Sequence, residues 1–349
     1  MDYSAPWWLP GGNLQTIWAA LRSRRYLGPA PQFRRERWTT PDSDFVDVDF
    51  LVDVQWQISA GPSQGKSGLL GNSALHETKS AGVQPLLVVF HGLEGSSESH
   101  YAEAFADAAR SRGWACAIPH FRGCSGELNL APRAYHSGDF AEIDWMLSTF
   151  AQCHQGPIVA VGISLGGNAL MRWAAEMEGS ARQRVAAVAS VCSPLDLAAS
   201  GWAIGRGFNR LVYTRMFLAS MVPKALKKLA QHPGLFDRDR LLAAKDLYAF
   251  DNIFTAPLHG FKDTDDYWAR ASAKPHLHRV QLPALALNAV NDPFVPAFSL
   301  PTAADVSAHV SLWQPAQGGH VGFPSAPFPG HVRAMPEAVA EFLAQHLPP

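Results

Sequence analysis

Residues 158–168 read IVAVGISLGGN, and this stretch decides the fold. A short apolar run rich in β-branched residues leads into the pentapeptide G-x-S-x-G, and a pattern typical of an apolar helix follows it. This is the pattern of a nucleophile elbow, a sharp turn between a strand and a helix that presents a serine hydroxyl. Side chains at Gly162 or Gly166 would collide with the turn. Because the pentapeptide alone also arises by chance, the matching elements on both sides of it favour Ser164 as a nucleophile.

The segments around this turn alternate between strand and helix patterns. Continuous apolar runs predict buried strands, and apolar residues at helical spacing predict helices between them. Strands are expected at 86–90, 115–119, 158–161, 185–191, 284–288 and 310–313, and helices near 100–112, 140–152, 165–177 and 336–346. Such alternation is typical of the α/β class with a mostly parallel, doubly wound sheet.

An earlier segment has a different period. From Phe45 to Val54 apolar side chains share one face, while Asp47, Asp49 and Asp53 share the other. Period two with one polar face predicts a half-exposed, antiparallel strand at the edge of the sheet.

Two insertions are expected in the core, which then comprises residues 1–195 and 276–349. Residues 57–84 are rich in Gly, Ser and Ala and predict a long loop insertion. Residues 196–275 carry helical patterns only and predict an inserted helical cap. An apolar stripe in the cap is expected to wall a ligand pocket; it consists of Ile204, Phe208, Leu211, Val212, Phe217, Leu218 and Met221. The basic run Lys224, Lys227 and Lys228 is expected to be a solvated helix end, and a membrane-surface role is the alternative.

A serine nucleophile needs a base, and the base needs a carboxylate that orients it. In this kind of sheet the chain order is Ser, then Asp or Glu, then His. Asp292 follows the strand at 284–288 and His320 follows the strand at 310–313, so both match in order and in place. Asp196 and Asp305 are the alternative carboxylates.

The oxyanion of the transition state needs two backbone N–H donors. One is expected from Leu165, directly after the serine, and the other from the turn after the strand at 86–90. That turn reads HGLEGSS, and we expect Leu93 to be its donor because Gly92 leaves the backbone free to turn the amide inward.

Charge and cysteine usage narrow the functional class. With 29 basic and 30 acidic residues the net charge is −1, so no global field would recruit nucleic acid. The N-terminus lacks the pattern of a secretory leader, and no charge-free apolar run reaches about 18 residues. The four cysteines have no metal-binding spacing and are expected to be reduced thiols. We therefore expect a cytoplasmic protein without stable membrane insertion, nucleic-acid partner, metal or organic cofactor.

Five stretches of the chain carry a family resemblance. They are PWWLPGGNLQT at 6–16, HGLEGS at 91–96, FRGCSGE at 121–127 with YHSG at 135–138, the elbow at 162–168, and NAVNDPF at 288–294 with GHVGF at 319–323. Together they resemble the YheT-like branch of the α/β hydrolases, also called the AB hydrolase 4 family. The resemblance implies an α/β-hydrolase fold and a charge relay of Ser164, Asp292 and His320. The chain departs from the usual pattern at Asn13, where His is common, and at Asn291, where Asp is common.

The resemblance and the residues together predict a serine carboxylic ester hydrolase. It would act on short- to medium-chain acyl esters, its small-molecule partners, through a Ser-Asp-His triad and an acyl-enzyme. Two alternatives use the same scaffold: an alcohol O-acyltransferase with the same triad, and a non-catalytic binding protein. Neither an oligomeric state nor a chemical role for the motifs at 122–126 and 135–138 follows from the sequence.

Overall fold

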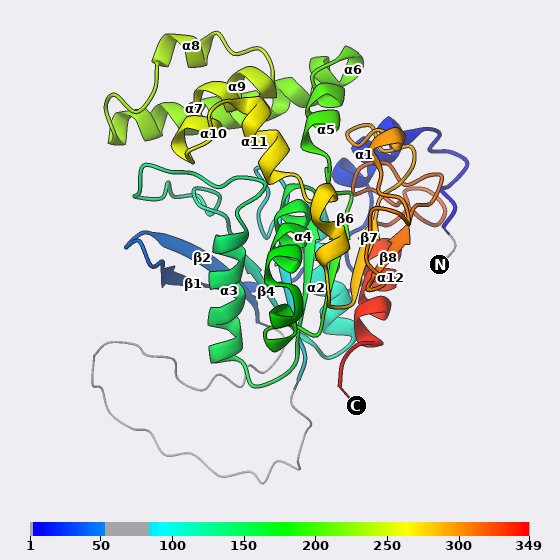
Figure 1. The fold of residues 1–349 in the computed structure, drawn as a ribbon. Coiled ribbons are helices and arrows are strands. Elements are labelled where there is room, and N and C mark those ends of the chain that lie inside the picture. Colours follow the sequence, from blue (N-terminus) through cyan, green and yellow to red (C-terminus); the bar gives the residue numbers. More distant parts are fainter. Residues whose placement is uncertain (1–2, 53–83, 349) are drawn as a thin grey trace.

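The computed structural model describes residues 3–52 and 84–348. Eight strands form one sheet in the order β1-β2-β4-β3-β5-β6-β7-β8 (Figure 1). Their bounds are β1 Phe33–Thr39, β2 Phe45–Leu51, β3 Leu86–Phe90, β4 Ala115–Pro119, β5 Ile158–Ile163, β6 Ala187–Val191, β7 Ala284–Leu287 and β8 Val310–Trp313. Of the predicted loop insertion at 57–84, all but Gln84 lies outside the described residues.

The sheet is mostly parallel, as the alternation of elements predicts. All neighbours from β4 through β8 pair in parallel, whereas β2 pairs antiparallel with both β1 and β4. Strands β3, β4, β5, β6 and β7 are buried along their whole length. A strand covered on both faces has no solvent side to mark with polar residues, which is why these strands read as continuous apolar runs.

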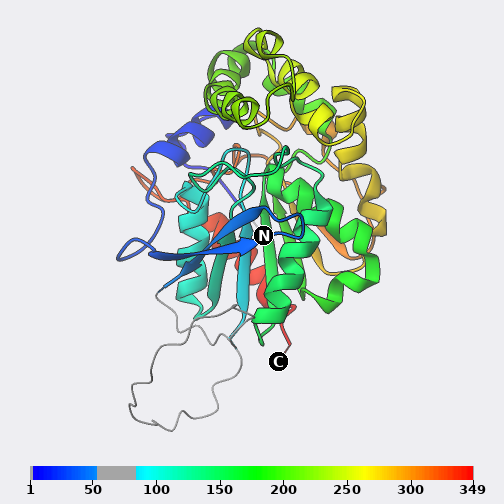
Figure 2. The same ribbon diagram turned by 90° about the vertical axis from the view of Figure 1, so that its left-hand side faces the viewer.

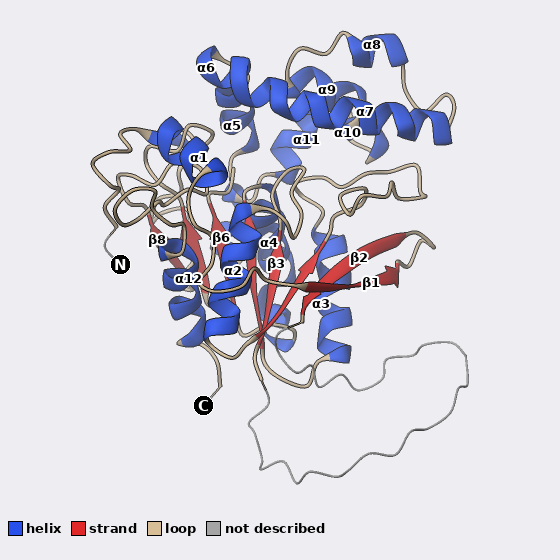
Figure 3. Cartoon of the chain, turned by 180° about the vertical axis from the view of Figure 1, so that it is seen from behind, coloured by secondary structure: helices blue, strands red, loops and turns tan. Residues whose placement is uncertain are grey.

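Helices cover both faces of the sheet and complete the doubly wound arrangement (Figure 2). On one face pack α2 (His100–Ser111) and α12 (Ala334–Ala344); on the other pack α3 (Phe140–Cys153), α4 (Leu165–Met177) and the 3-10 helix η3 (Lys274–Arg279). The sheet seen from behind runs between these two layers (Figure 3). The structure therefore confirms the predicted fold class.

Strand β2 differs from its prediction, and it lies between β1 and β4 instead of at the edge of the sheet. It is antiparallel as expected, but Asp47 and Asp49 are buried instead of facing solvent. Their partners lie on β1, where Arg37 bonds Asp47 at 2.8 and 2.9 Å and Arg35 bonds Asp49 at 2.7 and 2.8 Å. The prediction of a half-exposed strand was wrong because it did not include β1. The sequence of β1, FRRERWT, has too few apolar residues to be recognised as a strand that covers β2.

Short helices from residues 197 to 271 lie above the carboxyl ends of the strands (Figure 1). They are α5 (Leu197–Ile204), α6 (Gly207–Asn209), the π-helix η2 (Arg210–Thr214), α7 (Arg215–Gln231), α8 (Arg238–Leu242), α9 (Leu247–Ile253), α10 (Thr255–Leu258) and α11 (Thr264–Ala271). These elements, here called the cap helices, occupy the segment predicted as a cap. No helix in the described parts of the chain is long and apolar enough to cross a membrane.

The basic run on α7 is only in part the predicted solvated helix end: Lys227 is exposed and Lys224 is half-buried. Lys228 is buried, and its Nζ donates to the carbonyl oxygens of Asn129 and Ala131. Burial lowers the pKa of Lys228 to about 8. The prediction of a solvated helix end was wrong for Lys228 because α7 lies on the loop at 129–131, where backbone carbonyl oxygens accept from its Nζ.

Candidate active site

The turn between β5 and α4 holds Ser164 in a strained conformation. Its φ is 51° and its ψ is −117°, a region that costs a non-glycine residue on the order of 1–3 kcal/mol. A Cβ on Gly162 would lie 2.4 Å from the Cα of Gly167, and one on Gly166 would lie 2.5 Å from the carbonyl oxygen of His91. The two glycines are therefore required by close backbone approach, as the sequence predicts.

Three predicted residues meet at this turn. The Oγ of Ser164 lies 3.1 Å from Nε2 of His320, and Nδ1 of the same ring lies 2.9 Å from Oδ2 of Asp292. The other carboxylate oxygen of Asp292 accepts from the amides of Phe294, at 2.7 Å, and Val295, at 3.3 Å. With Nδ1–H donating to the buried carboxylate, Nε2 is left as an acceptor for the serine proton.

The alternative carboxylates lie elsewhere. Asp196 caps α5, where its side chain accepts from the amide of Ala199. Asp305 accepts from the amide and the hydroxyl of Thr302 in an exposed turn. Neither carboxylate bonds His320, so only Asp292 is placed to orient the imidazole.

The N-terminal segment supports the loops that carry the acid and the imidazole. Helix α1 spans Gly12–Leu21, and its buried Gln15 accepts through Oε1 from Nδ2 of Asn291 at 2.9 Å. Asn291 in turn accepts from the amide of Gly319 at 3.0 Å. The next α1 residue, Thr16, accepts from the amide of His320 at 2.8 Å. Sequence reasoning missed this role, because the network joins residues about 300 positions apart.

The two departures from the family pattern have physical partners here. An amide at Asn291 both donates and accepts, which an aspartate at that position does not do at neutral pH. At Asn13 the side-chain oxygen accepts from the hydroxyl of Tyr213 at 2.9 Å, and this bond joins α1 to the cap helices. Both asparagines therefore connect the N-terminal segment to the rest of the site.

The turn predicted to supply an oxyanion donor is held on both sides of Leu93. The amide of Gly92 donates to the hydroxyl of Tyr101, and the amide of Glu94 donates to the hydroxyl of Tyr135, both at 2.9 Å. The amide of Leu93, between them, donates to no group within residues 3–52 and 84–348. Because the amides on both sides of it are already hydrogen-bonded, the amide of Leu93 remains free to donate to an oxygen atom of a ligand.

The second predicted donor is the amide of Leu165 at the first position of α4. Amides in the first turn of a helix have no partner within the helix and point towards its N-terminus. The turn after β3 abuts this end, since a Cβ on Gly92 would lie 3.3 Å from the Cβ of Ser164. Leu93 and Leu165 both line the cavity above the serine.

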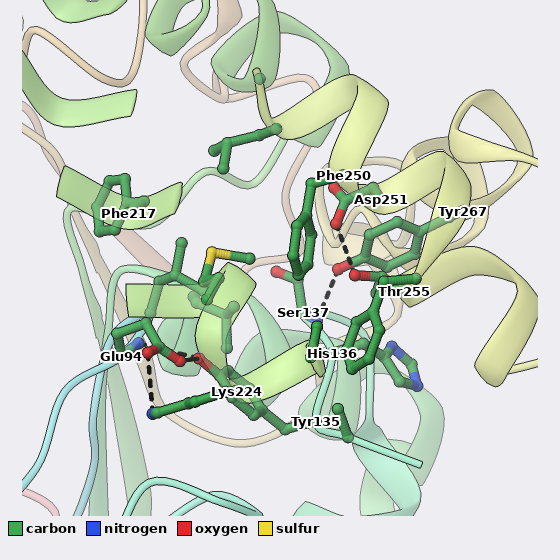
Figure 4. A pocket seen from close by; sticks show the side chains of 18 of the residues that line it. Glu94, Tyr135, His136, Ser137, Phe217, Lys224, Phe250, Asp251, Thr255 and Tyr267 are labelled. Carbon is green, nitrogen blue, oxygen red and sulfur yellow. Dashed lines mark hydrogen bonds and ion pairs between the residues drawn. The ribbon is translucent and has the colours of Figure 1, made fainter. Parts of the chain in front are cut away.

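Glu94 connects the turn after β3, residues 91–97 and here called the oxyanion turn for its predicted role, to the cap helices. Its φ is 58°, a left-handed value that favours glycine. Its carboxylate accepts from the hydroxyl of Tyr135 at 3.0 Å, from the hydroxyl of Ser220, and from Nζ of Lys224 at 2.8 Å. Ser220 and Lys224 lie on α7, so these contacts hold a strained turn against the cap helices. Figure 4 shows the contact between Glu94 and Lys224.

The motif at 122–126 has a structural role. The buried guanidinium of Arg122 bonds three carboxylates, which belong to Asp42, Asp44 and Glu142. The arginine thereby joins the β1–β2 hairpin to α3. Within the same motif, burial raises the pKa of the Cys124 thiol to about 12. The motif therefore braces the edge of the sheet, and it contributes no nucleophile.

The motif at 135–138 is held by the last residue of the elbow motif. Nδ2 of Asn168 donates to the carbonyl oxygens of Ser137 and Ala271, each at 2.8 Å, and its Oδ1 accepts from the amide of Ala273. A Cβ on Gly138 would lie 2.6 Å from the Cβ of Ala271. Asn168 thus fixes both the loop that carries Tyr135 and the end of α11.

Cys192 lies behind the triad. Its Sγ and ligand atoms of Asp292 and His320 lie within 4.8 Å of one another. Burial and the nearby Asp292 carboxylate raise the pKa of the Cys192 thiol well above its usual value. Because a metal ligand must be a thiolate, and Sγ already accepts from the amide of Val321 at 3.2 Å, this cluster fits a proton relay better than a metal site.

Ser164 lines a cavity of about 140 Å³. Figure 4 shows part of the wall of this cavity. Its core wall includes the oxyanion turn, residues of the loop at 122–137, the elbow and Phe294. Its cap wall consists of side chains of the cap helices. From the predicted stripe Ile204, Phe217 and Met221 line the cavity. Phe208, Leu211 and Val212 are exposed instead. The prediction that part of the stripe walls a pocket is therefore confirmed for three residues.

Comparison with known proteins gives the same fold from three directions. A family model described as the α/β hydrolase fold matches residues 85–327. A protein of Escherichia coli (strain K12) named "Putative esterase YheT" is 37% identical over 314 residues, covering 89% of this chain and 84% of that protein. Human "Phospholipase ABHD3" is 27% identical, covering 96% and 77%. An esterase of Pyrococcus furiosus has a similar structure, with a TM-score of 0.52 at 13% identity, covering 93% of this chain and 99% of that chain.

Proposed function

The chain belongs to the α/β hydrolase fold family, and from that premise we propose that it is a serine carboxylic ester hydrolase for short- to medium-chain acyl esters. The observation that carries the proposal is the hydrogen-bonded series from Ser164 through His320 to Asp292 at the floor of a largely apolar cavity. Relatives named as an esterase and as a phospholipase agree with cleavage of carboxylic esters.

The proposed reaction uses the residues in the roles that their geometry allows. Nε2 of His320 removes the proton from Ser164 as Oγ attacks the ester carbonyl, and the imidazolium then protonates the leaving alcohol. Asp292 holds the tautomer and stabilises the imidazolium. The amides of Leu93 and Leu165 stabilise the oxyanion. Water activated by His320 then hydrolyses the acyl-enzyme.

The size and lining of the cavity support a limit on the acyl chain. A dry cavity of about 150 Å³ in another protein takes benzene, a six-carbon ring, and this cavity is of similar volume at about 140 Å³. Each methylene buried against its apolar wall contributes about 0.8 kcal/mol. Catalytic efficiency is therefore expected to rise from acetate to butyrate or hexanoate, and to fall once the chain exceeds the space.

The test is a series of p-nitrophenyl esters from acetate to palmitate, measured with wild type and with Ser164→Ala. We expect an optimum near four to six carbons and a loss in kcat of about 10⁴-fold or more in the variant, because the triad acts as a unit. A folded Ser164→Ala protein that keeps a tenth of the activity would refute the nucleophile. Addition of a primary alcohol separates hydrolysis from acyl transfer: a large fraction of transesterified product would favour the acyltransferase.

A further inference from the structure

The cap wall of the cavity contains polar groups whose hydrogen-bonding capacity is not used. One face of α5, formed by Leu197, Ser200, Gly201 and Ile204, lines the cavity. Ser200 is only 2% exposed, and its Oγ has no hydrogen-bond partner in the described part of the chain. A buried hydroxyl without a partner lowers the stability of the folded protein. Its presence in a ligand cavity therefore points to a partner that arrives with the ligand.

Asp251 on α9 is the second such group. One of its carboxylate oxygens accepts from Oγ1 of Thr255 at 2.7 Å, and the other accepts from Nε1 of Trp268 at 3.0 Å. A carboxylate accepts about four hydrogen bonds, so capacity remains on both oxygens. Among residues 3–52 and 84–348 no cationic side chain pairs with this carboxylate. Burial raises the pKa of Asp251 to about 6, so the group is mostly ionised at neutral pH.

The third group is the phenol of Tyr267 on α11. Its oxygen accepts from the amide of Ser137 at 3.0 Å, while its own O–H donates to no acceptor in the described segments. Burial raises the pKa of Tyr267 well above its usual value, so the hydroxyl keeps its proton. In Figure 4, Asp251, Thr255 and Tyr267 lie together at one end of the cavity, away from Glu94 and Lys224.

The three groups belong to neighbouring parts of the cap wall. The indole of Trp268, which bonds Asp251, packs against α5 so closely that a Cβ on Gly201 would lie 2.3 Å from the ring. Gly201 follows Ser200 directly. This end of the cavity therefore combines an anionic acceptor, a phenol donor and a hydroxyl that can do either, here called the distal polar cluster.

We propose that the distal polar cluster binds a hydroxyl group on the acyl chain of the substrate, so that the preferred esters are those of ω-hydroxy fatty acids. A hydroxyl group both donates and accepts hydrogen bonds. It can therefore donate to the carboxylate of Asp251 and accept from the hydroxyl of Tyr267 or Ser200. An acyl chain that ends in a methyl group could bond none of these groups. A chain that ends in an ammonium group could donate to Asp251, but it would leave the hydroxyl hydrogens of Tyr267 and Ser200 unpaired. The inference deepens the proposed function, on which it rests for the placement of the acyl chain beneath the cap helices.

The test compares paired p-nitrophenyl esters of four to eight carbons, with and without a terminal hydroxyl. We expect at least one chain length at which the hydroxylated ester has a kcat/KM higher by about 10-fold or more, since a hydrogen bond to a charged group is stronger than one between neutral groups. Asp251→Asn, Tyr267→Phe and Ser200→Ala should each reduce this ratio towards one. The ratio compares two esters on one protein, so loss of folded enzyme cancels.

Tyr248→Phe is the matched control, because the hydroxyl of Tyr248 bonds Asp265 on the exposed side of the cap helices. It should leave the ratio unchanged. Calorimetric binding of the corresponding methyl esters to Ser164→Ala tests the cluster without turnover. If wild type cleaves no ester, the proposed function fails, and the binding preference still decides the inference. Unsubstituted esters bound as well or better at every length would overturn it, as would a ratio that the three variants leave intact.

Discussion

The core wall and the cap wall of the cavity differ in whether their polar side chains have hydrogen-bond partners. In the core wall the carboxylate of Glu94 bonds three side chains, those of Tyr135, Ser220 and Lys224, and these contacts hold the turn that presents the Leu93 amide. In the cap wall Ser200 has no partner, and the O–H of Tyr267 has none within the described ranges.

This difference indicates two roles for buried polar side chains: holding the site in place and binding a ligand. Groups that are fully paired fix geometry, because any shift breaks several bonds at once. Groups with free capacity cost stability until a ligand meets them. The core wall is therefore expected to govern kcat, since it sets the positions of the reacting atoms. The cap wall is expected to govern KM and the choice of substrate.

The largest effect is expected for Asp292→Asn on the core side. The amide cannot stabilise the imidazolium and allows the wrong tautomer of His320, so kcat should fall by about 10⁴-fold. The measurement is kcat with p-nitrophenyl butyrate, and Asp305→Asn is the matched control, expected to keep wild-type kcat. A loss below 10-fold in a folded Asp292→Asn protein would mean that another carboxylate orients the imidazole.

A smaller loss is expected for Gln15→Ala. Removal of the side chain leaves Asn291 without its acceptor, so the loops of Asp292 and His320 lose a common support. Small misplacement of catalytic groups costs up to about 10²-fold, and kcat should fall by about 10- to 100-fold with little change in KM. Gln314→Ala, which removes only a bond to the carbonyl of Pro301, should change neither. A rise in KM at unchanged kcat would contradict the division between the two walls.

The features that could be predicted from the sequence are those that depend on residues close together in the chain. The elbow, the strands at 86–90, 115–119 and 310–313, and the helix at 165–177 depend on local patterns, and the structure confirms their bounds. Asp292 and His320 followed from chain order and strand ends. Strand β1 and helix α1 were not predicted, because the one is too charged and the other too short in apolar periodicity to stand out.

The support of the site was equally hidden, for a different reason. Gln15, Glu94 and Tyr135 act through partners 41 to about 300 residues away, and one sequence gives no pairing between such positions. The burial of Asp47, Asp49 and Lys228 was also unpredictable, since each is compensated by groups from another element. The burial of a charged side chain can be predicted from the sequence only when the residue that pairs with it is known.

An intermediate effect is expected for Tyr135→Phe. The phenol is the common partner of the amide and the carboxylate of Glu94, so its loss loosens the turn that presents the Leu93 amide. We expect kcat to fall by about 10-fold, well below the 10²- to 10³-fold cost of removing an oxyanion donor outright. A trifluoromethyl ketone, which mimics the tetrahedral state, should lose affinity in parallel with kcat. An unchanged affinity together with a lower kcat would separate Tyr135 from the oxyanion turn.

The smallest effect is expected on the cap wall, for Phe217→Ala. The ring lines the cavity, and its removal enlarges the space for the acyl chain. At about 0.8 kcal/mol for each buried methylene, KM for butyrate should rise by about 4-fold or more while the preferred chain lengthens by one or two carbons. Phe208→Ala, on the exposed part of the same stripe, should shift neither value. A loss of kcat at constant chain preference would assign Phe217 to the core function instead.

The most direct test of the central claim is covalent labelling with a fluorophosphonate, followed by intact-protein and peptide mass spectrometry. The account predicts one phosphonyl adduct on wild type, located at Ser164, none on Ser164→Ala, and labelling of His320→Ala slowed by about 10³-fold or more. An adduct on another residue, or equal labelling of Ser164→Ala and wild type, would contradict it.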